Sequence, residues 1–163
     1  MKTLIIGYGN FDRQDDGIAW HVLKEVRTLL NLDTPESVPD SIEQDTDTAF
    51  VFQLQLLPED AEDIAQFDRV CFVDAHTGAV PEPVHVERLL PSWQNSPLTH
   101  HLTPNSLLSM VQAVFGKSPE AILVSIRGYE FEFTNSLSSR CRILVSQAAK
   151  TIYNWIIEAQ IPA

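Results

Sequence analysis

Short apolar runs alternate along this chain with longer segments in which apolar residues recur at helical spacing. Residues 3–6, 69–74 and 121–126 each contain a run of three or four consecutive apolar residues. Continuous apolar runs of this length are typical of parallel strands covered on both faces. We therefore predict three buried strands at these positions. A fourth, alternating segment at 84–90 predicts an edge strand that could be antiparallel, and the polar segment 41–48 is a weaker strand candidate.

Four segments show helical periodicity. The first follows Asp15 and Asp16, two acids that suit a helix N-terminus, and a second helix lies within 53–67, beginning near Pro58. A third helix begins at Pro104 and ends at Gly116, and a long last helix runs from about Leu137. The apolar positions of the first are Ile18, Val22, Val26, Leu29 and Leu30; of the third, Leu107, Leu108, Val111 and Val114; of the last, Ile143, Leu144, Ala148, Ile152, Trp155 and Ile156.

Strands and helices that alternate in this order predict the α/β class. We expect one domain spanning residues 1–163, a three-layer α/β/α sandwich. Its twisted sheet should be mostly parallel, with one antiparallel edge strand and helices on both faces. The length of 163 residues suits one such domain, and the 44% hydrophobic and 20% charged residues are ordinary for a globular protein.

Charge and cysteine usage narrow the possible partners. The net charge of −11 argues against nucleic acid, which needs clustered lysine and arginine. No apolar run approaches the length of a membrane span, and the chain passes from Met1 directly into a strand, so we expect neither a membrane partner nor a signal peptide. Cys71 and Cys141 have no metal or redox spacing, which favours reduced, buried thiols in the cytoplasm.

Polar residues with metal-binding chemistry fall at the ends of the predicted strands. Asp16 follows the first strand, Asp74 ends the strand at 69–74, and His100 and His101 precede the third helix. Ligands of open parallel sheets bind beyond the carboxyl ends of the strands. Two carboxylates and an imidazole suit a divalent metal such as Ni²⁺ or Zn²⁺. Each residue also has a structural alternative, as a helix-start acid, a turn cap or a surface histidine; their common edge favours a shared site.

The loop containing Gly7 and Gly9 matches the dinucleotide-binding fingerprint only in part. The fingerprint needs a third glycine where this chain has Asp12, and the acids around it would repel a pyrophosphate. A nucleotide-binding α/β enzyme is therefore disfavoured. The sequence also lacks the Gly-x-Ser-x-Gly motif of acyl-transfer serines.

The same loop belongs to a longer motif, Gly7-Tyr8-Gly9-Asn10-Phe11-Asp12-Arg13-Gln14-Asp15-Asp16-Gly17. This motif resembles the N-terminal signature of a known family, the hydrogenase maturation proteases. Further matches come in order: Phe72-Val73-Asp74-Ala75, then Thr99-His100-His101-Leu102-Thr103-Pro104 with Leu107-Leu108, then residues 128–133 with Leu137-Ser138. The match covers most of the chain. This sequence departs from the family pattern at residues 45–50, where many members have an Asp-Gly-Gly-Thr-like segment.

The resemblance implies an endopeptidase that removes the C-terminal extension of a [NiFe]-hydrogenase large-subunit precursor after nickel insertion. Its catalytic and metal-binding residues would be Asp16, Asp74 and His100, with His101 as the reserve ligand. Nickel would come with the precursor, and other divalent metals could substitute for it. Gly7, Gly9 and Asn10 would form a substrate loop, and the protein would act as a cytoplasmic monomer.

Several alternatives stay open at the level of sequence. A metal-activated water and a carboxylate general base are equally compatible with the residues. A metal-independent peptidase on a similar fold is possible, and so is a non-enzymatic nickel-site assembly partner that recognises the precursor without cutting it.

Overall fold

A sheet of six strands forms the centre of the molecule in a computed structural model that describes residues 1–39, 42–45, 47–94 and 101–161. The spatial order of the strands is β2-β3-β1-β4-β6-β5. Strands β1, β3, β4 and β6 are parallel, whereas β2 and β5 are antiparallel to their neighbours at the two edges. The bounds are β1 Thr3–Tyr8, β2 Glu43–Asp45, β3 Thr48–Gln53, β4 Arg69–His76, β5 Val84–Leu89 and β6 Glu120–Arg127.

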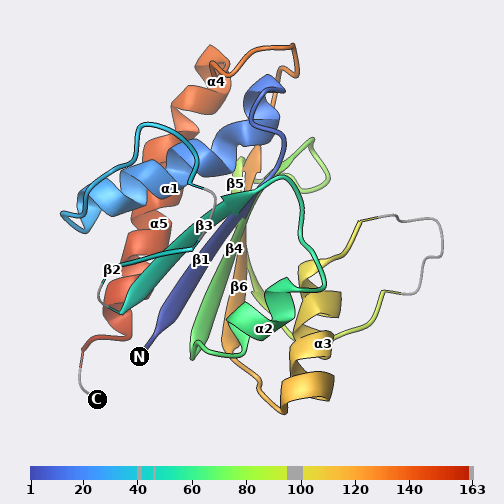
Figure 1. Cartoon of the computed structure of the whole chain (residues 1–163). Helices are drawn as coiled ribbons and strands as arrows, with labels where there is room; N and C mark the ends of the chain where they lie inside the picture. Colours follow the sequence, from blue (N-terminus) through green and yellow to red (C-terminus); the bar gives the residue numbers. More distant parts are fainter. Residues whose placement is uncertain (40–41, 46, 95–100, 162–163) are drawn as a thin grey trace.

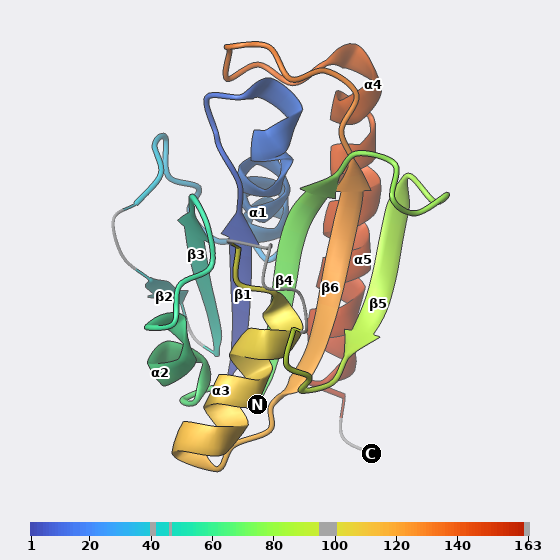
Figure 2. The same ribbon diagram turned by 90° about the vertical axis from the view of Figure 1, so that its right-hand side faces the viewer.

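Helices cover both faces of this sheet (Figure 1). Helices α1 and α5 lie on one face and α2 and α3 on the other, as the turned view also shows (Figure 2). The bounds are η1 Gln14–Gly17, α1 Ile18–Leu29, α2 Asp60–Ile64, α3 Pro104–Phe115, α4 Ser139–Arg142 and α5 Leu144–Glu158. The predicted three-layer, mostly parallel fold is confirmed, including the antiparallel edge strand β5. The second antiparallel strand, β2, adds to that prediction.

Strand β1 explains why two cores form. It lies between β3 and β4, and residues 3–7 are all buried. Successive side chains of a strand point to opposite faces. Ile5 therefore belongs to the core beneath α1 and α5, while Leu4 and Ile6 belong to the core beneath α2 and α3. Cys71 and Cys141 are both free and buried in the first of these cores.

The second predicted strand was misplaced. The segment 41–48 contains only the short β2, whose structure is described for residues 43–45, and the first residue of β3. The main strand of this region is β3, whose apolar stretch at 49–52 was not assigned to any element. Its side chains are buried on both faces, with Phe50 and Phe52 in the core beneath α1 and α5 and Ala49 in the core beneath α2 and α3. The prediction placed the strand on the polar residues that precede this short apolar run.

Helix α3 begins and ends where the sequence predicts. The Thr103 hydroxyl caps it by accepting a hydrogen bond of 3.2 Å from the Ser106 N–H, and Gly116 ends it with a left-handed φ of 64°. Val114, however, was predicted on the buried face and is 71% exposed. The last turn of α3 extends beyond the sheet (Figure 2), so its apolar stripe continues past the surface that it covers.

The predicted last helix is divided in two. Ser138 caps the short α4, and Ile143 joins α4 to α5. Ile143 was predicted to face the core and is instead 76% exposed. Among the described residues, no helix has the length and apolar character needed to cross a membrane.

The central packing of β4 gives a direct test of the fold. Phe72 is fully buried and is among the largest buried side chains of the core beneath α2 and α3. Phe72→Ala should lower the free energy of unfolding by about 4 kcal/mol, because it leaves a cavity that the sheet cannot close. Phe133→Ala is the matched control: this side chain is 93% exposed, and its loss should change stability by less than about 0.5 kcal/mol. Urea denaturation measures both, and equal effects would contradict the described core.

Candidate active site

The loop after β1 folds so that it aims the carboxylate of Asp16. Gly9 has a φ of 141°, and a side chain there would collide with the carbonyl oxygen of Asp16. The backbone therefore passes closer to Asp16 than any other residue would permit. The Asn10 N–H then donates a hydrogen bond of 2.8 Å to Oδ2 of Asp16. Gly9 and Asn10 thus position the carboxylate through the backbone.

Gly7 lets two elements pack closely together. It is buried, and a Cβ atom there would lie 3.1 Å from side-chain atoms of Ala19, Leu23 and Phe52. Its missing side chain lets α1 pack closely against β1. Gly9 and Asn10 line the cleft described below, whereas Gly7 is not among its lining residues. The predicted substrate-loop role of Gly7, Gly9 and Asn10 stays a prediction.

Asp15 is a structural anchor that the sequence did not single out. Its carboxylate is fully buried and accepts four hydrogen bonds from the segment before α4. The Tyr129 N–H, the Glu130 N–H and the Ser138 hydroxyl reach Oδ2 at 2.8, 2.9 and 2.6 Å, and the Ser138 N–H reaches Oδ1 at 2.8 Å. Burial alone would raise the pKa of Asp15, but these hydrogen bonds outweigh it and the net shift is downward.

Asp74 stands at the carboxyl end of β4, beside Tyr8 at the end of β1. The Ala75 N–H donates a hydrogen bond of 2.7 Å to Oδ1 of Asp74, and the Tyr8 hydroxyl is also hydrogen-bonded to this carboxylate. Burial and the charge of Asp16 raise the pKa of Asp74 to about 7, against the opposing effect of both hydrogen bonds. Burial and the charge of Asp74 likewise raise the pKa of the Tyr8 hydroxyl.

The histidine pair lies at the limit of the described chain. His100 falls outside the described residues, whereas His101 is described and exposed. The Gln94 side chain holds the backbone near His101: its Nε2 donates to the His101 carbonyl at 3.1 Å, and its Oε1 accepts from the Thr103 N–H at 3.1 Å. Gln94 therefore fixes where the chain enters α3.

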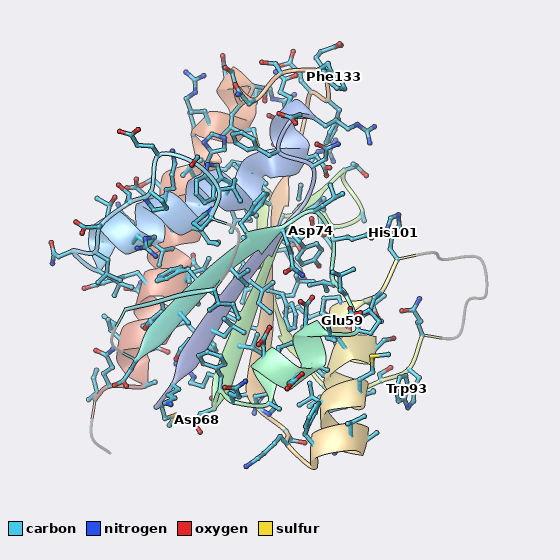
Figure 3. All side chains as sticks on the ribbon, viewed as in Figure 1. Glu59, Asp68, Asp74, Trp93, His101 and Phe133 are labelled. Carbon is cyan, nitrogen blue, oxygen red and sulfur yellow. The ribbon has the colours of Figure 1, made fainter. Side chains whose placement is uncertain are left out.

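A cleft of about 530 Å³ at the carboxyl edge of the sheet brings together Asp16, Asp74 and His101. We call it the acidic cleft. The side-chain view places Asp74 at the upper end of the central strands and His101 on the segment before α3, on the same side of the molecule (Figure 3). The residues that line the cleft are Tyr8, Gly9, Asn10, Arg13, Asp16, Leu54, Gln55, Leu56, Asp74, His101 and Leu102. Asp16, Asp74 and the reserve residue His101 thus line one cleft, whereas the predicted ligand His100 lies outside the described residues.

The cleft has the charge for a cation but not a complete ligand cage. Within the described part of the chain, no group of three histidine, cysteine or acidic side chains is arranged to hold a metal ion. Asp16 and Asp74 repel each other, and burial disfavours the charge of Asp74. A bound cation would relieve both costs, and its remaining ligands would come from elsewhere, such as a substrate. Alternatively, the two carboxylates could share a proton and act as acid and base.

Comparison with known proteins identifies the fold. No family model matches the sequence, and no curated protein matches it. Solved structures do match. The [NiFe] hydrogenase maturation protease HycI from Thermococcus kodakarensis KOD1 has a TM-score of 0.66 at 19% identity, covering 94% of this chain and 90% of that one. This chain has the fold of the hydrogenase maturation proteases.

Two further structures of that class agree with this result. The hydrogenase maturating endopeptidase HybD from E. coli has a TM-score of 0.69 at 18% identity, covering 98% of this chain and 94% of that one. The endopeptidase HycI from Escherichia coli has a TM-score of 0.61 at 16% identity, covering 95% and 91%. At these identities the likeness establishes the fold alone.

Sequence reasoning missed Tyr8, Asp15 and Gln94. Tyr8 had a usable signal, because it is a polar-ended side chain at the end of a buried strand, next to the turn that holds Asp16. Asp15 was noted only as a helix-start acid, since nothing local shows that its partners lie more than 100 residues away; Ser138 is 123 residues distant. Gln94 had no signal in a loop of mixed polar residues.

The anchor at Asp15 predicts a pH-dependent loss of stability. Asp15→Asn should lower the free energy of unfolding by about 3 kcal/mol near neutral pH, because the amide cannot accept all four hydrogen bonds. The folded pKa lies below the unfolded value, so the stabilising effect of the ionised form is complete above about pH 5 and disappears as the pH falls through the folded pKa. The difference in the free energy of unfolding between wild type and Asp15→Asn should therefore narrow below about pH 4. Urea denaturation at a series of pH values measures it.

Asp12→Asn is the control, since Asp12 is an exposed acid of the same loop. It should alter stability by less than about 0.5 kcal/mol at any pH. A gap between wild type and Asp15→Asn that stays constant down to about pH 2 would show that the Asp15 carboxylate is not the source of the effect.

Proposed function

We propose that this protein is an endopeptidase that removes the C-terminal extension of a [NiFe]-hydrogenase large-subunit precursor after nickel insertion. The observation that carries the proposal is the meeting of Asp16, from the short helix η1 after β1, and Asp74, from β4, in one cleft with His101. The fold supports it, since the similar solved structures include hydrogenase maturation proteases and endopeptidases. The protein would act as a cytoplasmic monomer.

In the proposed reaction the nickel is part of the substrate. Asp16 and Asp74 offer too few ligands to hold a metal ion by themselves. They fit a metal that is already bound by the precursor, because the precursor would supply the remaining ligands. A precursor without nickel would bring no cation to relieve the repulsion between Asp16 and Asp74, and it would dock poorly. This arrangement would make cleavage depend on prior metal insertion. His100, or in reserve His101, would supply the imidazole ligand.

The chain's own groups then have distinct tasks. Asn10 holds the Asp16 carboxylate, and Tyr8 and Ala75 hold that of Asp74, so both acids are oriented before the substrate binds. Preorganised charges of this kind stabilise a transition state without the cost of reorganisation. The peptide bond would be attacked by a water that is activated either by the metal or by one carboxylate. Both routes use Asp16 and Asp74.

A non-enzymatic role is the second candidate. A nickel-site assembly partner would use the same cleft to recognise the precursor and would release it uncut. The two candidates differ in one observable, the mass of the precursor after incubation.

The test incubates a nickel-loaded large-subunit precursor with each variant and follows its mass over time. Asp16→Asn and Asp74→Asn should each lower kcat/KM at least about 100-fold, because each removes a charge that is needed at the reacting centre. Asp12→Asn should cleave at the wild-type rate, since Asp12 is exposed and does not line the cleft. Stable binding by the wild-type protein without any loss of mass would replace the protease by the assembly partner.

The same assay distinguishes the roles of His100 and His101. His100→Ala should lose processing, whereas His101→Ala should retain most of it. Full processing by His100→Ala together with loss in His101→Ala would move the ligand to His101. Wild-type cleavage of a precursor prepared without nickel would contradict the dependence on substrate-held metal and would favour a metal-independent peptidase.

A further inference from the structure

Two arginines stack on one aromatic ring at the same edge of the sheet. The guanidinium carbon of Arg140 lies 4.0 Å from the centroid of the Tyr129 ring, and that of Arg127 lies 5.3 Å from it. Together with His76 and the turn at residues 80–83, they line a pocket of about 280 Å³ that is separate from the acidic cleft. A chain with a net charge of −11 thus concentrates two cations on one small surface.

The position of Arg127 is fixed by its surroundings. Its Nε donates a hydrogen bond of 3.1 Å to the Gly128 carbonyl. Its guanidinium occupies the space that a side chain at residue 78 would need, and Gly78 has a φ of 104° that suits glycine. His76 keeps this turn folded: its Nδ1 accepts from the Gly78 N–H at 3.1 Å, and its Nε2 therefore donates to the Glu82 carbonyl at 3.0 Å. The guanidinium is held in place before any ligand binds.

Neither guanidinium has a carboxylate partner among the described residues. The terminal nitrogens of Arg127 and all the nitrogens of Arg140 lack a hydrogen-bond acceptor within the described parts of the chain. Glu82 lines the pocket, but its carboxylate lies 3.3 Å from Nδ1 of His85. Guanidinium groups are suited to planar, bidentate recognition of a carboxylate. The pocket is therefore lined by two guanidinium groups that have no carboxylate partner in the described chain.

The pocket and the acidic cleft lie within reach of one bound polypeptide. Asp74 pairs with Ser125 and His76 with Arg127 in the parallel register of β4 and β6, so Arg127 stands one strand across and two residues further along than Asp74. Strand geometry puts their Cα atoms about 8 Å apart. Alternation along the strands places Asp74 and Arg127 on the same face, the one that α3 partly covers in Figure 2.

We propose that Arg127 and Arg140 form a carboxylate-binding subsite for the polypeptide substrate. The subsite takes either the free C-terminal carboxylate of the extension or an acidic side chain beside the cleaved bond. This inference rests on the proposed peptidase function and adds to it a second point of attachment. A substrate bound by its metal in the acidic cleft and by its carboxylate at the arginines would be fixed in direction as well as in position.

The test measures KM and kcat for cleavage of the nickel-loaded precursor. Arg127→Gln and Arg140→Gln should each raise KM about tenfold while kcat changes less than about twofold, because each removes a charge-assisted contact that binds the substrate and not the transition state alone. Arg140→Lys should recover part of the affinity. Arg88→Gln is the control, since Arg88 is exposed, carries the same charge, and pairs with Ile122 toward the opposite end of β6.

The outcomes separate this inference from the proposed function. Wild-type cleavage with unchanged KM in both glutamine variants would overturn the subsite and leave the peptidase standing. Absence of cleavage by the wild type would overturn the peptidase itself. An equal rise of KM in Arg88→Gln would show that the effect comes from the change in net charge. This result would also overturn the subsite. Thermal unfolding of each variant excludes loss of fold, and Arg140, whose side chain is exposed, is the safer of the two positions.

The source of the carboxylate is found with modified substrates. A precursor whose extension ends in an amide should show the raised KM if the subsite takes the C-terminus, and the arginine variants should add nothing further. Replacing acidic residues of the extension by their amides should do the same if the subsite takes a side chain. Unchanged KM for every modified substrate would overturn the proposal.

Discussion

The buried carboxylate of Asp15 holds together two parts of the chain on which the site depends. It joins the loop after β1 to the segment before α4 through four hydrogen bonds, so the first and last connections at this edge of the sheet cannot move independently. Its neighbour Asp16 faces the cleft from the same short helix η1. The two adjacent acids thus differ in role, since Asp15 anchors the loop and Asp16 presents its carboxylate to the cleft.

The electrostatic cost of bringing two acids together supports the proposal that the cleft is the functional site. Folding proteins normally leave acids apart and hydrated, whereas here Asp74 is largely removed from water beside Asp16, and its pKa rises to about 7. The same edge of the sheet carries two arginines, Arg127 and Arg140, without a carboxylate partner among the described residues. The fold therefore keeps uncompensated negative and positive groups about one strand apart. That separation suits a ligand with both a cationic and an anionic part.

Features encoded by neighbouring residues could be predicted from the sequence, whereas features decided by distant contacts could not. Apolar runs and caps correctly located β1, β4, β6 and α3, and the rule that sites lie at carboxyl strand ends brought Asp16 and Asp74 together. Strand β3 was missed although its apolar run at 49–52 is of the same kind as those of β1, β4 and β6, because the strand was placed on the polar residues before that run. The roles of Gly7 and Asp15 depend on packing and hydrogen bonds made by residues remote in sequence. His100 lies outside the described residues, so its role stays a prediction.

The buried cysteines have a practical consequence for chemical labelling. The thiolate is the form that reacts with alkylating reagents. Burial raises the pKa of the Cys71 thiol, and burial together with the charge and hydrogen bond of Asp15 raises that of Cys141 to about 12. Both native thiols should therefore stay inert while the protein is folded. A single cysteine introduced at the rim of the cleft would then carry a fluorophore or spin label selectively, without removal of the two natural ones.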